Sequence, residues 1–277
     1  MGREYFLRSR YISSTKRISI SEERYVDIKR MRGALSAGLA IEELFDILCS
    51  NFVELKNEAE AASSEYINFP SVTYEFGYEL MRRINVRAIN YITAARFYID
   101  NVPTHIARAA DSTASDMYKI KTSQLYDSEM YYRVIYALRN FSLHTGAIIG
   151  GVKGSFVPGK GDVIFYVSKK DIQERSDRMK KEIVDEMPEK LNIIEACAGS
   201  MSCLNDLHVF VRKQYVPKLE NSRADLEFLQ EDCSKVLGEK VLLSACAFQG
   251  EEEVEHVLLI TEWDDVRRYL VDKNSIT

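Results

Sequence analysis

The chain has 277 residues, of which 46% are hydrophobic, so it can bury one large core or two modest ones. Its formal net charge of −5 excludes a generic polycation, and any contact with nucleic acid must therefore be local. The five cysteines show no CxxC spacing, and we interpret them as reduced thiols of a cytoplasmic protein. The chain starts without an apolar signal segment and contains no apolar run of membrane-spanning length, so we expect no membrane partner.

Residues 1–33 form a basic arm in this otherwise acidic chain. Nine Lys or Arg residues stand there against four acidic ones, an excess of five positive charges. Two interpretations remain open: a solvated segment, or a segment that contacts the phosphate backbone of RNA. In the second interpretation the RNA-binding residues of the arm include Arg8, Arg10, Lys16 and Arg17.

The middle of the chain has the apolar spacing of amphipathic helices. We expect helices over 35–66, 72–101 and 128–144, with a shorter one within 104–126. The prolines and glycines set the expected boundaries. Pro70 ends the first helix and Ser71 caps the second, while Pro103 ends the second and Gly146 ends the helix over 128–144.

After Gly146 the pattern changes to glycine-rich, β-type runs, which predict a β insertion over about 147–168 with a strand at 163–168. Helical spacing returns over 187–236, with a break expected near Pro217. The C-terminal part, about 238–272, predicts a β-hairpin followed by a short helix. The expected fold is therefore mainly α: a helical bundle over about 35–236 with minor β-hairpin additions, in a single domain 1–277.

Two apparent motifs do not support a site. The sequence GSFVPGKG at 154–161 is close to a phosphate-binding loop, but it ends on Gly161 where a hydroxyl is needed and a strand follows instead of a helix. His105, His208 and His256 have no Cys, Asp or His at ligand spacing, so each is interpreted as structural. We expect neither a metal nor a cofactor.

The helix expected over 128–144 has an unusual outer face. On a helical wheel its core side carries apolar groups: Tyr131, Val134, Leu138 and Phe141, with Met130 at the margin. The opposite arc carries Tyr132, Arg133, Tyr136, Asn140 and Leu143. Because a solvated face would carry Lys and Glu, we expect something other than water to cover this arc.

Three polar residues at the end of this helix suggest chemistry on phosphate. Arg139 offers a planar set of donors that suits phosphate and stays charged, and His144 can act as an acid or a base. Asn140 is four residues before His144, so their side chains can touch. A simpler interpretation is that His144 only interacts favourably with the dipole at the helix C-terminus.

The sequence LRNFSLH at 138–144 resembles the R-x(4–6)-H signature of the HEPN superfamily, including the polar residue that often follows the arginine. The resemblance implies a metal-independent endoribonuclease in a toxin or antiviral defence system. His144 would act as general base or acid for the RNA 2′-OH, Arg139 would stabilise the charged phosphorane, and Asn140 would orient His144 or the phosphate. An alternative remains open: a non-catalytic HEPN-like module that binds nucleotides or proteins.

The resemblance also implies a homodimer whose two motifs line one cleft. Arg139 and His144 are ~140° apart on an ideal helix, so a two-fold axis could bring one chain's arginine to the other's histidine. Arg133 and Tyr136 would then contact RNA beside that axis. An antitoxin or another defence-system protein is a possible further partner. HEPN toxins regulated by tyrosine modification carry that tyrosine two residues after the histidine, where this chain has Gly146.

Overall fold

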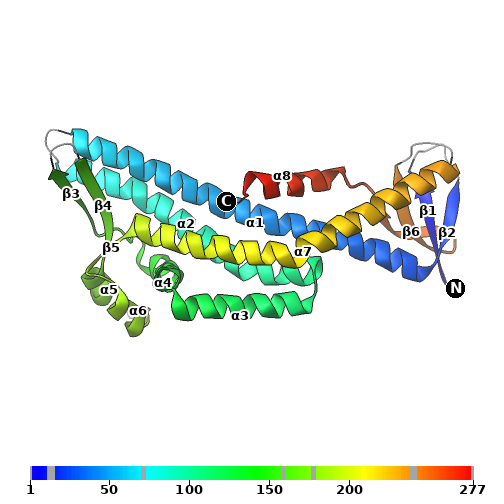
Figure 1. The fold of residues 1–277 in the computed structure, drawn as a ribbon, viewed down its shortest axis with the longest axis horizontal. Helices are drawn as coiled ribbons and strands as arrows, with labels where there is room; N and C mark the ends of the chain where they lie inside the picture. The colour runs from blue at the N-terminus through cyan, green and yellow to red at the C-terminus, as the bar shows by residue number, and fades with distance from the viewer. Residues whose placement is uncertain are drawn as a thin grey trace.

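A computed structural model describes residues 2–10, 16–69, 73–157, 160–175, 179–237 and 242–275. The fold is mainly α with minor β additions, as predicted. The molecule is elongated and is built on three long helices that pack against one another: α1 (Glu22–Asn68), α2 (Tyr74–Ala109) and α7 (Ile193–Leu237). Two shorter helices, α3 (Ser112–Ser128) and α4 (Met130–Thr145), pack against α2 and α7 (Figure 1).

Side-chain caps fix where several helices begin. Ser21, Thr73 and Asp111 each accept a hydrogen bond from a backbone N–H three residues later, at the starts of α1, α2 and α3. The expected boundary at Pro70 and Ser71 falls outside the described residues; the cap of α2 is Thr73.

The predicted breaks at Pro103 and Pro217 are wrong, because both prolines lie inside helices. Proline cannot donate the hydrogen bond to the carbonyl four residues earlier. At Pro103 that carbonyl belongs to Ile99, and the Tyr118 hydroxyl of α3 donates to it instead at 3.2 Å. A neighbouring helix thus satisfies the acceptor that the proline leaves open, and α2 continues to Ala109.

One antiparallel sheet lies at the end of the molecule that carries the N-terminus (Figure 1). Its strand order is β2-β1-β6-β7, and the strands are β1 (Arg3–Ser9), β2 (Arg17–Ile20), β6 (Leu243–Gln249) and β7 (Glu252–Leu258). The hairpin expected near the C-terminus is β6–β7. Within the basic arm, residues 3–9 and 17–20 are strands and helix α1 starts at Glu22.

The second sheet lies at the opposite end and has the order β3-β4-β5, with β3 (Gly151–Val157), β4 (Lys160–Ser168) and β5 (Lys190–Asn192). Two short helices, α5 (Lys169–Arg175) and α6 (Lys181–Glu186), lie between β4 and β5 in the chain. Helix α7 therefore starts at Ile193, not at 187. The sequence GSFVPGKG ends at Gly161 within strand β4, so a strand follows it, as predicted.

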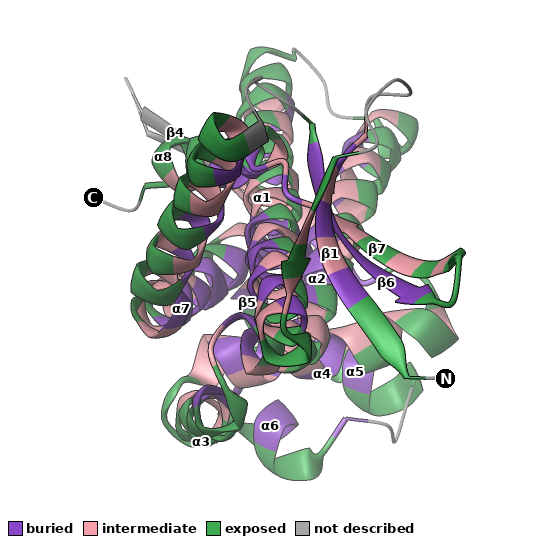
Figure 2. Cartoon of the chain, turned by 90° about the vertical axis from the view of Figure 1, so that its right-hand side faces the viewer, coloured by how far each residue is buried: buried purple, intermediate pink, exposed green. Residues whose placement is uncertain are grey.

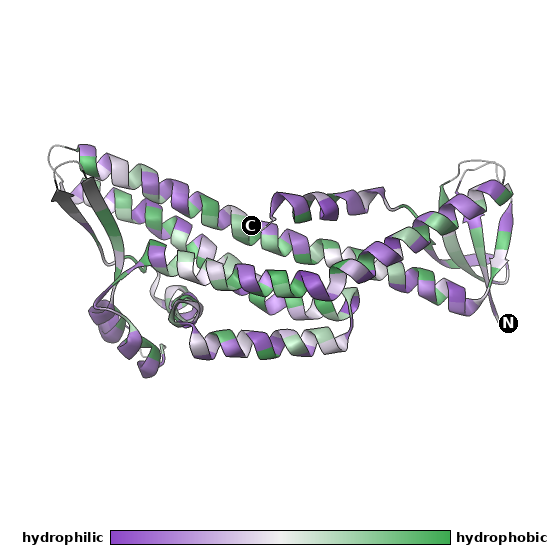
Figure 3. Cartoon of the chain, viewed as in Figure 1, coloured by the Kyte–Doolittle hydropathy of each residue, from purple (hydrophilic) through white to green (hydrophobic). Residues whose placement is uncertain are grey.

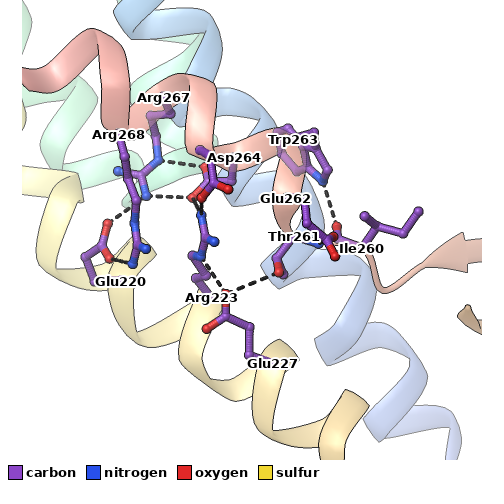
Figure 4. A network of polar contacts seen from close by, with 11 residues as sticks. Glu220, Arg223, Glu227, Ile260, Thr261, Glu262, Trp263, Asp264, Arg267 and Arg268 are labelled. Atoms are coloured by element: carbon purple, nitrogen blue, oxygen red, sulfur yellow. Dashed lines mark hydrogen bonds and ion pairs between the residues drawn. The ribbon is translucent and has the colours of Figure 1, made fainter. Parts of the chain in front are cut away.

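The C-terminal segment is fixed by charged groups that lie between α7 and α8 (Asp265–Lys273). A short 3-10 helix, Glu262–Asp264, precedes α8. Arg267 is almost fully buried and donates to Asp264 and to Glu220 of α7, each at 2.7 Å. Arg223 of α7 donates to Asp264 from the other side (Figure 4). Because the charges are paired, their burial is compatible with a stable fold.

Buried residues line the contact between the long helices, and the inner strands β1 and β6 continue this core at one end (Figure 2). A charged group lies in the middle of the apolar core: Glu42 of α1 is completely buried. It accepts hydrogen bonds from Arg212 at 2.6 and 3.0 Å and from the Tyr215 hydroxyl, both on α7.

His208 completes this buried cluster. Its Nε2 lies 3.4 Å from Glu42, its Nδ1 lies 2.9 Å from the Tyr98 hydroxyl of α2, and its ring stacks on Phe45 with centroids 3.6 Å apart. Burial alone would raise the pKa of Glu42, but the hydrogen bonds from His208, Arg212 and Tyr215 lower it from 4.5 to about 2. Burial lowers the pKa of His208. The native pair is therefore a carboxylate and a neutral imidazole.

The first prediction concerns Glu42. In Glu42→Ala the buried donors on His208, Arg212 and Tyr215 lose their acceptor, and we expect the free energy of unfolding to fall by about 3–5 kcal/mol. Urea denaturation measures this loss. The control is Glu43→Ala, because Glu43 is exposed, and its effect should stay within about 0.5 kcal/mol. Equal stability of the two variants would mean that the buried cluster contributes nothing.

The second prediction is a pH dependence of stability. Because the pKa of His208 is lowered on folding, the imidazole is protonated below pH 6.5 in the unfolded chain but stays neutral in the folded chain. Stability should therefore fall as pH decreases from 6.5, by up to about 1.4 kcal/mol per pH unit for one proton. Glu42 adds a loss of the same sign, between pH 4.5 and about 2.

Urea titrations at several pH values between 5 and 8 measure this slope. In His208→Gln the slope should decrease, whatever the absolute stability of that variant. The same slope in both proteins would exclude His208 as its source. His105, whose pKa is lowered by burial and by Arg108, contributes with the same sign in both proteins.

Candidate functional site

The candidate site is the C-terminal end of α4, where Gly146 ends the helix as predicted. Gly146 has φ of 80°, a conformation that favours glycine. The chain beyond it is held by two side chains. Arg175 of α5 donates to the carbonyl of Thr145 at 2.8 Å, and Asn85 of α2 accepts from the N–H of Ile148 at 2.9 Å. The end of α4 is therefore fixed by α2 and α5.

Arg139, Asn140 and His144 lie on the last turns of α4. Asn140 and His144 are exposed, and Arg139 is half-buried. Arg139 Nη1 donates to Asn140 Oδ1 at 3.2 Å, and no ion pair joins Arg139 to a described residue. A neutral amide thus holds this guanidinium and leaves its charge uncompensated by a carboxylate.

The hydrogen bond between Arg139 and Asn140 also changes how the motif is aimed. Although Arg139 and His144 are ~140° apart on an ideal helix, Asn140 is one turn before His144 on nearly the same line. Since the guanidinium is bonded to Asn140, it is turned toward the side of α4 that carries His144. One helix can therefore present all three groups at one end.

Arg133 does not have a charge available for RNA. Its guanidinium donates to Glu186 of α6 at 2.7 Å and to the carbonyls of Tyr126 and Asp127 at 2.7 Å each. These are the unpaired carbonyls at the end of α3, so Arg133 joins α3, α4 and α6. In this structure Arg133 holds neighbouring helices together. Its charge is paired with Glu186, so the predicted contact with RNA has no unpaired guanidinium to use.

The expected outer arc of α4 is wrong for its tyrosines. Tyr132 is 3% exposed, and Tyr136 is half-buried, with its ring against Tyr126 of α3 and under the guanidinium of Arg96 of α2. Helices α2 and α3 of the same chain bury Tyr132 and contact the Tyr136 ring, which stays partly exposed. Tyr131, expected in the core, is half-buried and donates to Glu195 at 2.7 Å. The helical wheel misplaced these three tyrosines because other helices pack on two sides of α4.

Two arginines of the basic arm are paired with one carboxylate of the N-terminal sheet. Arg8 and Arg10 both donate to Glu253 of β7, at 3.2 and 2.6 Å. The guanidinium of Arg17 lies 4.3 Å from the centre of the Phe6 ring, and Lys16 is exposed just before β2. The structure therefore brings Arg8, Arg10, Lys16 and Arg17 to the N-terminal sheet, on other elements than Arg139 and His144.

The remaining histidines and cysteines give no second site. His208 belongs to the buried cluster, and His256 lies 3.1 Å from Glu253 at the surface. Burial raises the pKa of Cys49 to about 11, which disfavours its thiolate. In the part of the chain that the structure describes, no three His, Cys, Asp or Glu side chains are arranged to hold a metal ion.

Sequence reasoning missed that α4 forms a groove with α2 and α3. Tyr118, Thr122 and Tyr126 of α3 line it with Tyr132 and Tyr136 of α4. Each set has a spacing of four residues, which marks one face of a helix. This spacing was a usable signal, but it could not show that the two faces meet.

Comparison with known proteins gives no relative: the chain matches no protein-family model, no curated protein and no solved structure. Hydrophilic and hydrophobic residues alternate along all the long helices (Figure 3). Accordingly, none of the helices within the described ranges is both long and apolar enough to cross a bilayer.

Proposed function

We propose that this protein is a metal-independent endoribonuclease of the HEPN type. The observation that carries the proposal is the arrangement of Arg139, Asn140 and His144 at the end of α4. Arg139, which has no carboxylate partner among the described residues, is bonded to the Asn140 amide, and Asn140 is one helical turn before the exposed His144. Arg133, six residues earlier on the same helix, is paired with Glu186 in the usual way. Arg139 keeps the charge that a phosphodiester would neutralise.

The proposed reaction uses the RNA's own 2′-hydroxyl. His144 removes its proton, the O2′–P bond forms, and the P–O5′ bond breaks as the leaving oxygen takes up a proton from water; His144 then returns its proton to the solvent. The products are a 2′,3′-cyclic phosphate and a 5′-hydroxyl. Negative charge grows on the phosphorus oxygens during this step, and the Arg139 guanidinium stabilises it. Asn140 orients the arginine through their hydrogen bond. A toxin or antiviral defence role, in the cytoplasm and with a controlling partner protein, completes the proposal.

The third prediction tests this reaction. Purified protein incubated with total RNA in EDTA should cleave it and leave 2′,3′-cyclic phosphate ends. His144→Ala and Arg139→Ala should each lower the rate, His144→Ala by on the order of 10²–10⁴ because an acid–base group is lost. The matched control is His256→Ala, since His256 is an exposed histidine on another element. Cleavage that requires Mg²⁺ and leaves 5′-phosphates would contradict the proposal.

Dimerisation is the second part of the proposed function. Tyr132 is buried within the chain and the Tyr136 ring packs against Tyr126 of the same chain, so neither argues for a dimer. The remaining argument for a dimer is Leu143, which is 61% exposed and stands between Asn140 and His144 in the sequence. We place the second copy against this end of α4, where two motifs would share one cleft about a two-fold axis.

The fourth prediction follows from this placement. Leu143→Asp sets two like charges against each other beside the axis, and it should shift the protein from dimer to monomer in sedimentation velocity. The control is Phe228→Asp, because Phe228 is 68% exposed on α7 and far along the chain from α4. A wild-type protein that is monomeric at all concentrations would exclude the dimer while leaving the cleavage reaction untouched.

A further inference from the structure

A groove of about 550 Å³ lies between α2, α3 and α4. These three helices pack against one another beside α7 (Figure 1). Four tyrosines line the groove, together with three cationic side chains and one carboxylate: Tyr118, Tyr126, Tyr132 and Tyr136, with Arg96, Lys119, Lys180 and Asp100. Aromatic planes and an excess of positive charge therefore meet in one concave surface of an acidic protein.

The tyrosine hydroxyls differ in how they are satisfied. Tyr118 donates to the Ile99 carbonyl, so its hydroxyl has a structural partner. The hydroxyls of Tyr126, Tyr132 and Tyr136 make no hydrogen bond to any described residue. Tyr132 is the decisive case, because its side chain is only 3% exposed, yet among the described residues only the hydroxyls of Tyr25 and Tyr91 are buried without a partner. The Tyr132 hydroxyl therefore keeps contact with solvent in the groove, where a ligand would replace that solvent as its hydrogen-bond partner.

The cations of the groove lie over the aromatic rings. The Arg96 guanidinium lies 4.0 Å from the centre of the Tyr136 ring and is also paired with Asp100 at 2.7 Å. The Lys180 ammonium lies 5.8 Å from the centre of the Tyr126 ring and has no ion pair with a described residue. Lys119 is exposed and is paired with Asp116 at 3.0 Å. Lys180 is therefore the cation most available to an anion.

We propose that this groove binds a nucleotide. A planar base suits the Tyr126 and Tyr136 rings, since stacking on aromatic side chains is the general way that proteins hold unpaired bases. The base edge offers acceptors and donors to the Tyr132 hydroxyl, and the phosphate pairs with Lys180. A neutral peptide or a neutral sugar would use the rings but leave the charge of Lys180 unpaired. The nucleotide is either free or part of an RNA strand.

This proposal does not depend on RNA cleavage, and its test measures binding alone. The wild-type protein is titrated with the four ribonucleoside 5′-monophosphates and with a hexamer of deoxynucleotides, which lacks the 2′-hydroxyl and cannot be cleaved by the proposed reaction. Isothermal calorimetry gives the dissociation constants. Binding of a monophosphate identifies a free nucleotide as the ligand, and binding of the hexamer alone identifies a strand.

Three variants locate the binding in the groove. Tyr136→Ala should weaken binding about 5- to 100-fold through lost stacking. Tyr132→Phe removes only a hydroxyl and should weaken it about 3- to 10-fold without loss of folding. Lys180→Ala should weaken binding and flatten its salt dependence, whereas the matched control Lys181→Ala should not. Absence of saturable binding to every probe would overturn the proposal. So would wild-type affinity in both Tyr132→Phe and Lys180→Ala.

Discussion

The buried carboxylate of Glu42 is the constraint on which the rest of the structure depends. An ionised group at the centre of an apolar core costs several kcal/mol unless donors surround it. The donors come from α7, while His208 is itself held by Tyr98 of α2 and by the Phe45 ring of α1. The carboxylate is satisfied only when α1, α2 and α7 have one particular register. Apolar packing alone would tolerate a slip along these helices; the buried charge does not.

That register determines where α4 lies. Helix α4 packs on α2 and α7, and its C-terminal end is fixed by Asn85 of α2. Close contacts leave it little freedom. A side chain added at Gly199 of α7 would lie 2.2 Å from the Tyr131 ring, so the two helices approach closely at a residue that has no side chain. A motif on a short helix thus gains a rigid support from the long helices beneath it.

Sequence reasoning predicted the mainly helical fold and the helix that ends at Gly146, because both depend on apolar spacing and on one glycine. It failed where contacts with residues far away in the sequence determine the structure. Arg8 and Arg10 were expected either to be solvated or to contact RNA, yet Glu253 pairs with both at the sheet that β1 and β2 form with β6 and β7. Pro103 suggested a helix end, yet a hydroxyl from α3 satisfies the free carbonyl. Arg139 and Asn140 could be selected from the sequence, but their hydrogen bond could not.

The motif and the tyrosine groove are connected through α4. Tyr132, Tyr136 and Asn140 have a spacing of four residues, so they form one row along the helix, and Tyr136 precedes Asn140 by ~6 Å of helix rise. The groove lies at one end of this row and His144 at the other. A base held against Tyr136 would therefore direct the adjoining phosphodiester along α4 toward Arg139. Binding and chemistry would then use different turns of one helix. The half-buried Tyr136 would hold the base, and the exposed His144 at the helix end would reach the scissile bond.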